Sequence, residues 1–304
     1  MTLGILLTGA ASSAPATIEI ATTSQPYVRL HVKNSDLRVR VALGFDKALL
    51  LNLPVAARAG LKPFPFIGKA TFKGNLFPGG EALVRGNLYD VAVERQGPLA
   101  VPVLWFDKTL ADDSDGVISA LAIAAEHVVV TQAAAPRGGT VYAITRAGKL
   151  GAAINAEVGG IKVHVILDLR SPETVFNGSA AAAFDRAGLV KRTGKVGLWS
   201  PFPGVALPFE RVTPAPGATL AGLPLIAPAA RITEARAKEL DARAKAGTST
   251  ADQDDDASGE ITVTGRKKRA QAPWVLIGRD VLDHCSRIDL DRAGAKWMLT
   301  CNFS

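Results

Sequence analysis

The two cysteines, Cys285 and Cys301, are the residues whose spacing most directly predicts a chemical bond. They flank two runs of alternating residues that are separated by a three-residue loop, 292–294, which predicts a β-hairpin. If Asp291 faces Ala295 in that hairpin, Cys285 faces Cys301, and directly opposed residues have Cβ atoms at the separation that a disulfide requires. We therefore predict a disulfide, with two buried thiols as the alternative.

Other arrangements that could carry chemistry find little support. Ligation of a metal by His284 with the two cysteines would lack a fourth ligand and any usual spacing, so we expect no metal site. No Gly-x-Ser-x-Gly elbow occurs, so no motif indicates a serine hydrolase. No Gly-x-Gly-x-x-Gly loop or Walker loop occurs either, so no motif indicates nucleotide binding. We expect no cofactor.

The elements that would position any site are mostly strands. Short alternating segments bounded by Gly, Pro and Asn predict a mainly β protein, with strands at 27–32, 38–43, 82–84, 88–93, 101–105, 127–131, 161–167, 196–199 and 274–277. Short helices are expected at 54–59 and 179–187, because Gly60 and Gly188 follow them as stop signals.

Two segments of the chain, 39–61 and 163–189, repeat one pattern. In each, an apolar strand leads into a loop, a second apolar strand ends at Asn, and a helix closes on Arg-Ala-Gly-Leu. Further on, Val117-Ile118-Ser119 in the first half parallels Leu276-Ile277-Gly278 in the second. The repeat predicts two related lobes.

This repeat resembles the aspartic proteases, especially the bacterial retropepsin-like branch. The resemblance implies a two-lobed pepsin/retropepsin-like acid-protease fold with short helices, in which each lobe carries Asp-Thr/Ser-Gly beside a hydrophobic-hydrophobic-Gly segment. Two adjacent carboxyl groups are needed because they share one proton, so that one acts as base toward water and the other as acid. The lobes are expected at 25–145 and 146–304, after an N-terminal tail, 1–24.

By this resemblance, Asp168 stands where the family's aspartate stands in the second lobe. The usual Thr or Ser is replaced by Leu169 and the usual Gly by Arg170, whereas Gly278 keeps the later glycine. Losing the hydroxyl removes a hydrogen bond between the loops, and Arg170 puts a cation where the backbone turns tightly. The catalytic motif of the second lobe is therefore degenerate.

The first lobe departs further from the family pattern. Its equivalent of Asp168 is Gly44 when aligned from the preceding strand, or Leu43 when aligned from Asn52, and neither is a carboxylate. Asp46 is the nearest acid, a weak catalytic candidate out of register, and Ser119 replaces the expected glycine.

A polar insert, about 232–270, lengthens the second lobe. Its start, Thr233 to Lys245, predicts a short solvated helix, and its middle is low-complexity and predicts a surface loop. Its end, 259–269, is similar to the short Val-Thr-Gly segment of TonB-dependent outer-membrane receptors, with a solvated β-prone patch as the alternative.

The net charge of +7 belongs largely to this insert, because Arg266 to Arg269 supply four of those charges. The remainder is mixed in sign, and no recognition element accompanies it, so we expect no nucleic-acid partner. No apolar run is long enough for a membrane helix, so we expect no integral membrane segment. A hydrophobic fraction of 48% and a charged fraction of 21% exclude collagen-like and wholly disordered chains.

Two features predict a periplasmic or secreted location. Residues 1–14 are an apolar stretch followed by small residues, which indicates a truncated or weak secretory signal, with a small-residue tail as the alternative. The predicted disulfide points to an oxidising compartment.

The leading hypothesis is an envelope protein that resembles aspartic proteases, lacks standard proteolytic activity, and binds a peptide or protein in the cleft between its lobes. The first alternative is an active aspartic endopeptidase that pairs Asp168 with Asp46 or with Asp168 of a second chain. The second alternative is an adaptor that captures an envelope protein through the segment 234–269.

Overall fold

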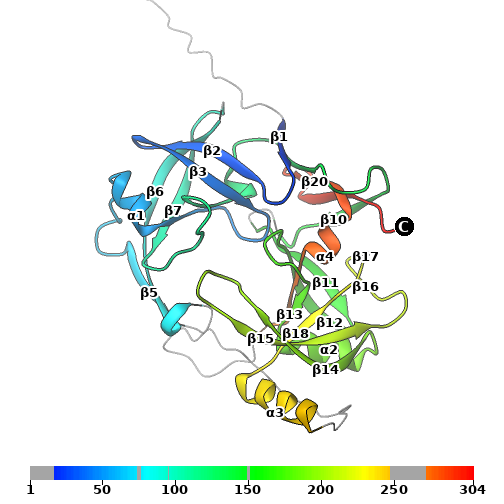
Figure 1. Cartoon of the computed structure of the whole chain (residues 1–304). Helices are drawn as coiled ribbons and strands as arrows, with labels where there is room; N and C mark the ends of the chain where they lie inside the picture. Colours follow the sequence, from blue (N-terminus) through cyan, green and yellow to red (C-terminus); the bar gives the residue numbers. More distant parts are fainter. Residues whose placement is uncertain (1–16, 74–76, 95, 149–150, 247–271) are drawn as a thin grey trace, which may run out of the picture.

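The computed structural model describes residues 17–73, 77–94, 96–148, 151–246 and 272–304. The described residues form a mainly β structure, in which short helices accompany barrel-like sheets (Figure 1). The predicted N-terminal tail up to residue 16 and the insert from 247 to 271 lie outside the described residues.

The first sheet has seven strands in the order β2-β3-β8-β4-β7-β6-β5. β2 also pairs with β6, which curls the sheet into a barrel-like form. Its strands are β2 (Tyr27–Val32), β3 (Ser35–Ala42), β4 (Leu49–Asn52), β5 (Lys69–Lys73), β6 (Glu81–Val93), β7 (Leu99–Phe106) and β8 (Gly116–Ser119). The predicted strands 82–84 and 88–93 are therefore parts of one long strand, β6.

The second sheet also has seven strands, in the order β11-β12-β19-β13-β18-β15-β14. Its strands are β11 (Ile154–Val158), β12 (Ile161–Leu167), β13 (Val175–Phe176), β14 (Val190–Trp199), β15 (Leu207–Pro214), β18 (Ala229–Arg231) and β19 (Trp274–Ile277). A small pair, β16 (Thr219–Leu220) and β17 (Leu223–Pro224), lies between β15 and β18 in the chain.

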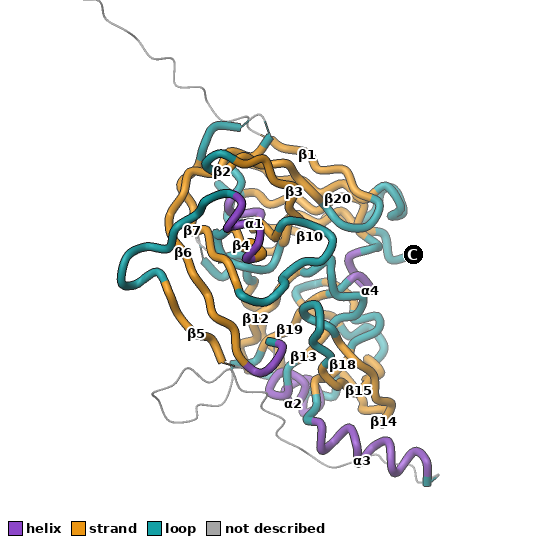
Figure 2. The backbone as a smooth tube through the Cα atoms, turned by 60° about the vertical axis from the view of Figure 1, so that its left-hand side comes forward, coloured by secondary structure: helices purple, strands orange, loops and turns teal. Residues whose placement is uncertain are grey.

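The two seven-stranded sheets have the same connectivity. In each, a hairpin leads into a parallel pair, β3 with β8 and β12 with β19. In the first sheet, β4 runs antiparallel to β8 and parallel to β7. In the second, β13 runs antiparallel to β19 and parallel to β18 in the same way. Figures 1 and 2 show β2, β3, β6 and β7 of the first sheet above β14, β15 and β18 of the second.

A third sheet of five strands joins segments that are far apart in the chain. Its order is β1-β9-β20-β21-β10, with β1 (Thr17–Thr22), β9 (His127–Gln132), β10 (Thr140–Thr145), β20 (Cys285–Asp291) and β21 (Lys296–Cys301). The start, the middle and the end of the described chain therefore share one sheet, and one continuous apolar core extends from it into both seven-stranded sheets.

The helices are short. They are α1 (Leu53–Arg58), α2 (Gly178–Arg186), α3 (Glu234–Lys245) and α4 (Arg279–Leu282), with 3₁₀ turns at Pro78–Gly80 and Ala120–Ala122. None of the described helices has the length and apolar character to cross a membrane.

Helix α3 begins where its sequence predicts, because the Thr233 hydroxyl accepts a hydrogen bond from the Arg236 amide at 3.1 Å. The prediction that this helix is solvated holds for most of its residues, which are exposed, but not for one face. Ala237 and Leu240 are buried with Ile232, and Val196 of β14 packs against them. Alanines between charged residues leave one narrow apolar face, which is enough to dock the helix on the second sheet.

Cys285 and Cys301 form the predicted disulfide and are direct partners in the β20–β21 ladder. The rest of the predicted register was wrong by one residue, because Asp291 pairs with Lys296 and the loop has four residues, 292–295. A register shift between Cys285 and Arg287 brings the cysteines back into opposition. This β-bulge adds one residue to β20, which the hydrophobic pattern alone does not reveal.

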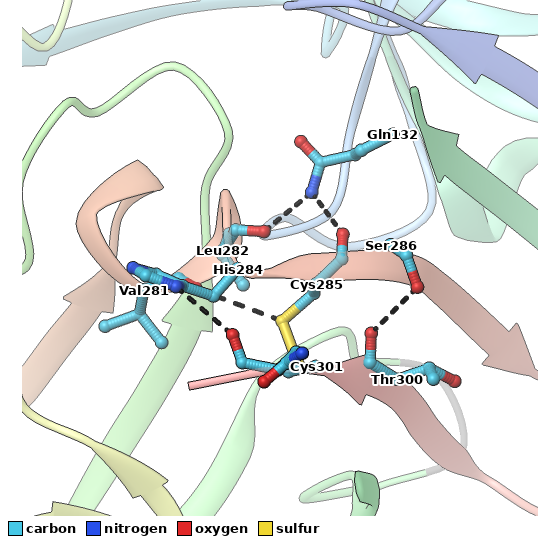
Figure 3. The surroundings of a disulfide bond; sticks show 9 residues. Gln132, Val281, Leu282, His284, Cys285, Ser286, Thr300 and Cys301 are labelled. Atoms are coloured by element: carbon cyan, nitrogen blue, oxygen red, sulfur yellow. Dashed lines mark hydrogen bonds between the residues drawn. A yellow bond between two sulfur atoms is a disulfide. The ribbon is translucent and has the colours of Figure 1, made fainter. Parts of the chain in front are cut away.

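Gln132 of β9 fixes the end of α4 and the start of β20 beside the disulfide (Figure 3). Its side-chain amide donates hydrogen bonds to the backbone carbonyls of Leu282 at 2.6 Å and Cys285 at 2.8 Å. Through this contact and the β9–β20 pairing, the middle of the chain is bonded to the disulfide hairpin.

Replacing both cysteines by alanine is expected to lower the free energy of unfolding by about 2 to 3 kcal/mol, because the bond closes a short loop in the unfolded chain. The measurement is urea unfolding of the wild type and the Cys285→Ala/Cys301→Ala variant, each with and without reductant. Reductant should destabilise the wild type and leave the variant unchanged. Equal stability of the two oxidised proteins would contradict this expectation.

Candidate ligand-binding site

Asp168 follows the last residue of β12, where the strand leaves the second sheet. Its backbone amide donates to the carbonyl of Ile277 at 2.9 Å, so the parallel pairing of β12 with β19 continues to this residue. The alternating apolar residues of β12 are buried in the core, and this anchors the strand that presents Asp168. The Asp168 side chain is 11% exposed.

The Asp168 carboxylate is bound by Arg170, two residues further on. The Arg170 amide donates to Oδ1 at 2.8 Å, Nε lies 3.2 Å from each oxygen, and a terminal nitrogen donates to Oδ2 at 3.0 Å. The other terminal nitrogen donates to the Pro201 carbonyl at 3.3 Å. A fork-shaped contact of this kind occupies both carboxylate oxygens and fixes their orientation.

The strand registers place Ala42 at the position equivalent to Asp168, instead of the predicted Leu43 or Gly44. Leu167 pairs with Ile277 in the second sheet as Val41 pairs with Ile118 in the first, so the next residues, Asp168 and Ala42, correspond. Side chains on a strand alternate with a period of two, so a two-residue slip preserves the hydrophobic pattern that the sequence alignment relied on. The first sheet therefore has the methyl group of Ala42, and no carboxylate, at the position equivalent to Asp168.

By the same register Gly44 corresponds to Arg170, and it lies against the end of β12. A Cβ at Gly44 would lie 2.3 Å from the Cγ2 atom of Ile166 and 2.8 Å from the carbonyl oxygen of Leu167. The loop after β3 therefore approaches the end of β12 so closely that no side chain fits at Gly44 without movement of these neighbours.

The other motif residues have structural partners. The Ser119 hydroxyl donates to the Phe45 carbonyl at 2.8 Å and accepts from the Leu121 amide at 3.2 Å. Leu169 is buried in the core, and its carbonyl accepts a hydrogen bond from the Gln25 side chain. Gly278 lies so close to Glu173 that a Cβ would be 2.3 Å from that residue's carbonyl oxygen.

Asp46 takes no part in the hydrogen bonds of the Asp168 carboxylate described above. It is exposed, and its carboxylate lies beside Gly151, where an added Cβ would be 3.2 Å from Oδ1. No hydrogen bond or ion pair between Asp46 and Asp168 is present in the described part of the chain.

Asp168 and Arg170 line a cavity of about 440 Å³ between the loop after β3 and the second sheet. Its walls are mainly apolar and aromatic, and it holds a second arginine, Arg231 of β18. The lining residues are Ala42, Gly44, Phe45, Ile166, Asp168, Arg170, Trp199, Pro201, Phe202, Arg231, Trp274 and Leu276.

A further buried cation, Arg40 of β3, lies near this cavity. It is 3.5 Å from Asp113, and its pKa is lowered by burial and by the nearby charge of Arg170. We did not predict Arg40 or Arg231 as site residues. The sequence has no signal for either residue: Arg40 alternates with the apolar Val39 and Val41, which is the pattern of a solvent-facing residue, and Arg38, with the same pattern, is exposed.

No protein-family model matches the chain, and no significant similarity to a curated protein is found.

Among the described residues no group of three or more His, Cys, Asp or Glu side chains could hold a metal ion. The cavity thus combines one ion-paired carboxylate, two arginines and aromatic walls, an arrangement suited to binding a polar group attached to an apolar body.

Proposed function

We propose that this chain is an aspartic-protease-like protein of the bacterial envelope that binds a peptide or protein segment in the cavity beside Asp168 and does not cleave it by the standard aspartic mechanism. The proposal includes the two-lobed pepsin/retropepsin-like fold. Two sheets of identical strand order support that fold, because a duplicated lobe is the organisation that this family shares.

The observation that carries the functional proposal is the asymmetry between Asp168 and Ala42. Aspartic proteases activate water with two carboxyl groups that share one proton. Here one position has only a methyl group, and the remaining carboxylate is bound at both oxygens by Arg170. A carboxylate bound in this way lacks the second carboxyl group with which it would share a proton.

The envelope location rests on the disulfide in the terminal hairpin. Structural disulfides persist in oxidising compartments and are rare in reducing ones. The predicted secretory signal lies outside the described residues, so its support for an envelope location comes from the sequence alone.

The test is incubation of the protein with a broad peptide library at acid pH, with Asp168→Asn as the matched variant. We expect no cleavage above background from either protein. Pepstatin-sensitive cleavage that disappears in Asp168→Asn would establish the alternative, an active aspartic endopeptidase. The adaptor alternative concerns a segment of which only α3 is described, and no contact of the described residues favours it.

A further inference from the structure

The loop between α1 and β5 presents apolar side chains to the solvent. Phe66 is fully exposed, Ile67 is 79% exposed and Phe64 is 51% exposed. Figure 2 shows this loop at the left-hand side of the molecule, projecting away from the sheets. Single exposed apolar residues are common on protein surfaces, but a cluster of them at a projecting position indicates contact with an apolar partner.

Backbone hydrogen bonds hold this loop in one conformation. The Gly68 amide donates to the Phe64 carbonyl at 2.9 Å. Gly86 of β6 fastens both residues, because it accepts from the Phe64 amide and donates to the Gly68 carbonyl, each at 2.9 Å. Phe66 at the tip has a φ of +65°, which a bulky residue rarely adopts. The loop therefore holds an aromatic side chain in solvent at a cost in backbone strain, and such strain is typical of functional positions.

An apolar hollow of about 470 Å³ adjoins the loop. It lies on the face of the first sheet that is turned away from the core, and Leu88 there is 65% exposed. The apolar residues that line it include Phe64, Ile67, Phe72, Leu88, Pro102 and Leu104. None of its lining residues lines the cavity beside Asp168. Phe66 and these six residues form a separate surface, which we call the apolar patch.

Cationic side chains surround the apolar patch. Lys69 and Arg85 line the hollow, and the exposed Lys62 comes shortly before the aromatic residues of the loop. The salt bridges of the described residues include none of these three side chains. Glu81 is further away, opposite Lys73 at the other end of β5. An apolar centre with a basic rim suits an apolar partner that carries negative charge.

We propose that the apolar patch attaches this protein to the surface of a lipid bilayer that contains anionic lipids. Phe64, Phe66 and Ile67 enter the boundary between the headgroups and the acyl chains, and the lysines contact the anionic headgroups. The protein lies on the bilayer and does not span it through this patch. The inference goes beyond the proposed function and does not depend on it, because it concerns a different surface.

The charge and shape of the patch favour a bilayer over other partners. Two copies of this chain that met through the patch would bring their basic rims together, and the like charges would repel each other. An acidic protein would match the charge but would need a shaped pocket for the protruding Phe66. A bilayer is fluid, so it accepts a protruding side chain without a preformed pocket.

The experiment measures sedimentation of the full chain with phosphatidylcholine vesicles that contain or lack phosphatidylglycerol. We expect binding to the anionic vesicles to be at least about tenfold tighter than binding to the neutral ones, and to weaken as salt is added. Arg266 to Arg269 would also attract anionic vesicles, so a variant that keeps these residues and changes only the apolar tip decides the question.

That variant is Phe66→Asn/Ile67→Ser. It should fold, because Asn tolerates the left-handed conformation of residue 66 and both side chains are exposed. We expect it to bind the anionic vesicles at least about tenfold more weakly than the wild type. Val141→Ser, which changes a 57% exposed apolar residue on β10, is the matched control and should bind as the wild type does. Lys62→Gln/Lys69→Gln should weaken binding by at least about fivefold.

Equal binding by the wild type and Phe66→Asn/Ile67→Ser would overturn the inference, and so would a wild type that does not bind the anionic vesicles. Sedimentation velocity without vesicles tests the second-copy alternative. A dimeric wild type and a monomeric Phe66→Asn/Ile67→Ser, with unchanged vesicle binding, would assign the patch to self-association instead. These results leave the peptide-binding proposal untouched, because its cavity shares no lining residue with the hollow.

Discussion

Gly278→Ala is expected to lower the free energy of unfolding by about 4 kcal/mol or to prevent folding, the largest effect of any substitution considered. The added Cβ would lie 2.3 Å from the carbonyl oxygen and 2.4 Å from the carbonyl carbon of Glu173, and 2.9 Å from the carbonyl oxygen of Ser171. These are backbone atoms, so no side-chain rotation relieves the contact. The loop between β12 and β13 would have to move away from the end of β19.

Urea unfolding followed by circular dichroism measures this effect. Gly148→Ala is the matched control, because a Cβ at Gly148 meets no atom within 4 Å among the described residues beyond its chain neighbours. The control is expected to change stability by less than about 0.5 kcal/mol. If Gly278→Ala proved as stable as Gly148→Ala, the close packing of β19 against the loop that follows Asp168 would be refuted.

Arg170→Gln is expected to lower the free energy of unfolding by about 3 kcal/mol, because it leaves the Asp168 carboxylate largely buried without its cation. The Asp168 side chain is 11% exposed and that of Arg170 is 28% exposed. Because the pair is only partly buried, we take the lower end of the loss in unfolding free energy that is typical when one partner of a buried ion pair is removed. The double variant Asp168→Asn/Arg170→Gln is expected to recover most of the loss, since no uncompensated charge then remains.

The measurement is a double-mutant cycle over the wild type, both single variants and the double variant. The Arg279–Asp283 pair on α4 provides a control, because its side chains are 35% and 44% exposed and such pairs contribute less than about 1 kcal/mol. Additive effects at Asp168 and Arg170 would contradict the idea that the two side chains form one coupled unit.

Several strands and helix ends could be predicted from the sequence because local patterns determine them, whereas strands such as β1, β10, β11 and β15 were not predicted. Alternation of apolar residues predicted β2, β12 and β19 with their observed bounds, and the hydroxyl of Thr233 marked the start of α3. The opposition of Cys285 and Cys301 was also predicted, although through a hairpin register that proved wrong.

The details of the site could not be predicted, because they depend on register and on long-range packing. The correspondence of Asp168 with Ala42 follows from ladder partners, and a two-residue slip leaves the strand pattern unchanged. Arg231 reaches the cavity only because β18 pairs with β15 and β13, strands assembled from distant segments. A single arginine among Ala229, Ala230 and Ile232 carries no local signal for such a position.

The most direct test of the central claim is amide hydrogen exchange of the protein, measured by mass spectrometry at acid pH with and without a peptide mixture. The same spectra report which amides of the protein are protected and whether the peptides are cleaved. If the cavity beside Asp168 binds peptides without cleaving them, amides in 42–45, 166–170 and 199–202 should exchange more slowly when the mixture is present. The peptides themselves should remain intact. Unchanged exchange in these segments, or new peptide termini that Asp168→Asn abolishes, would contradict the claim.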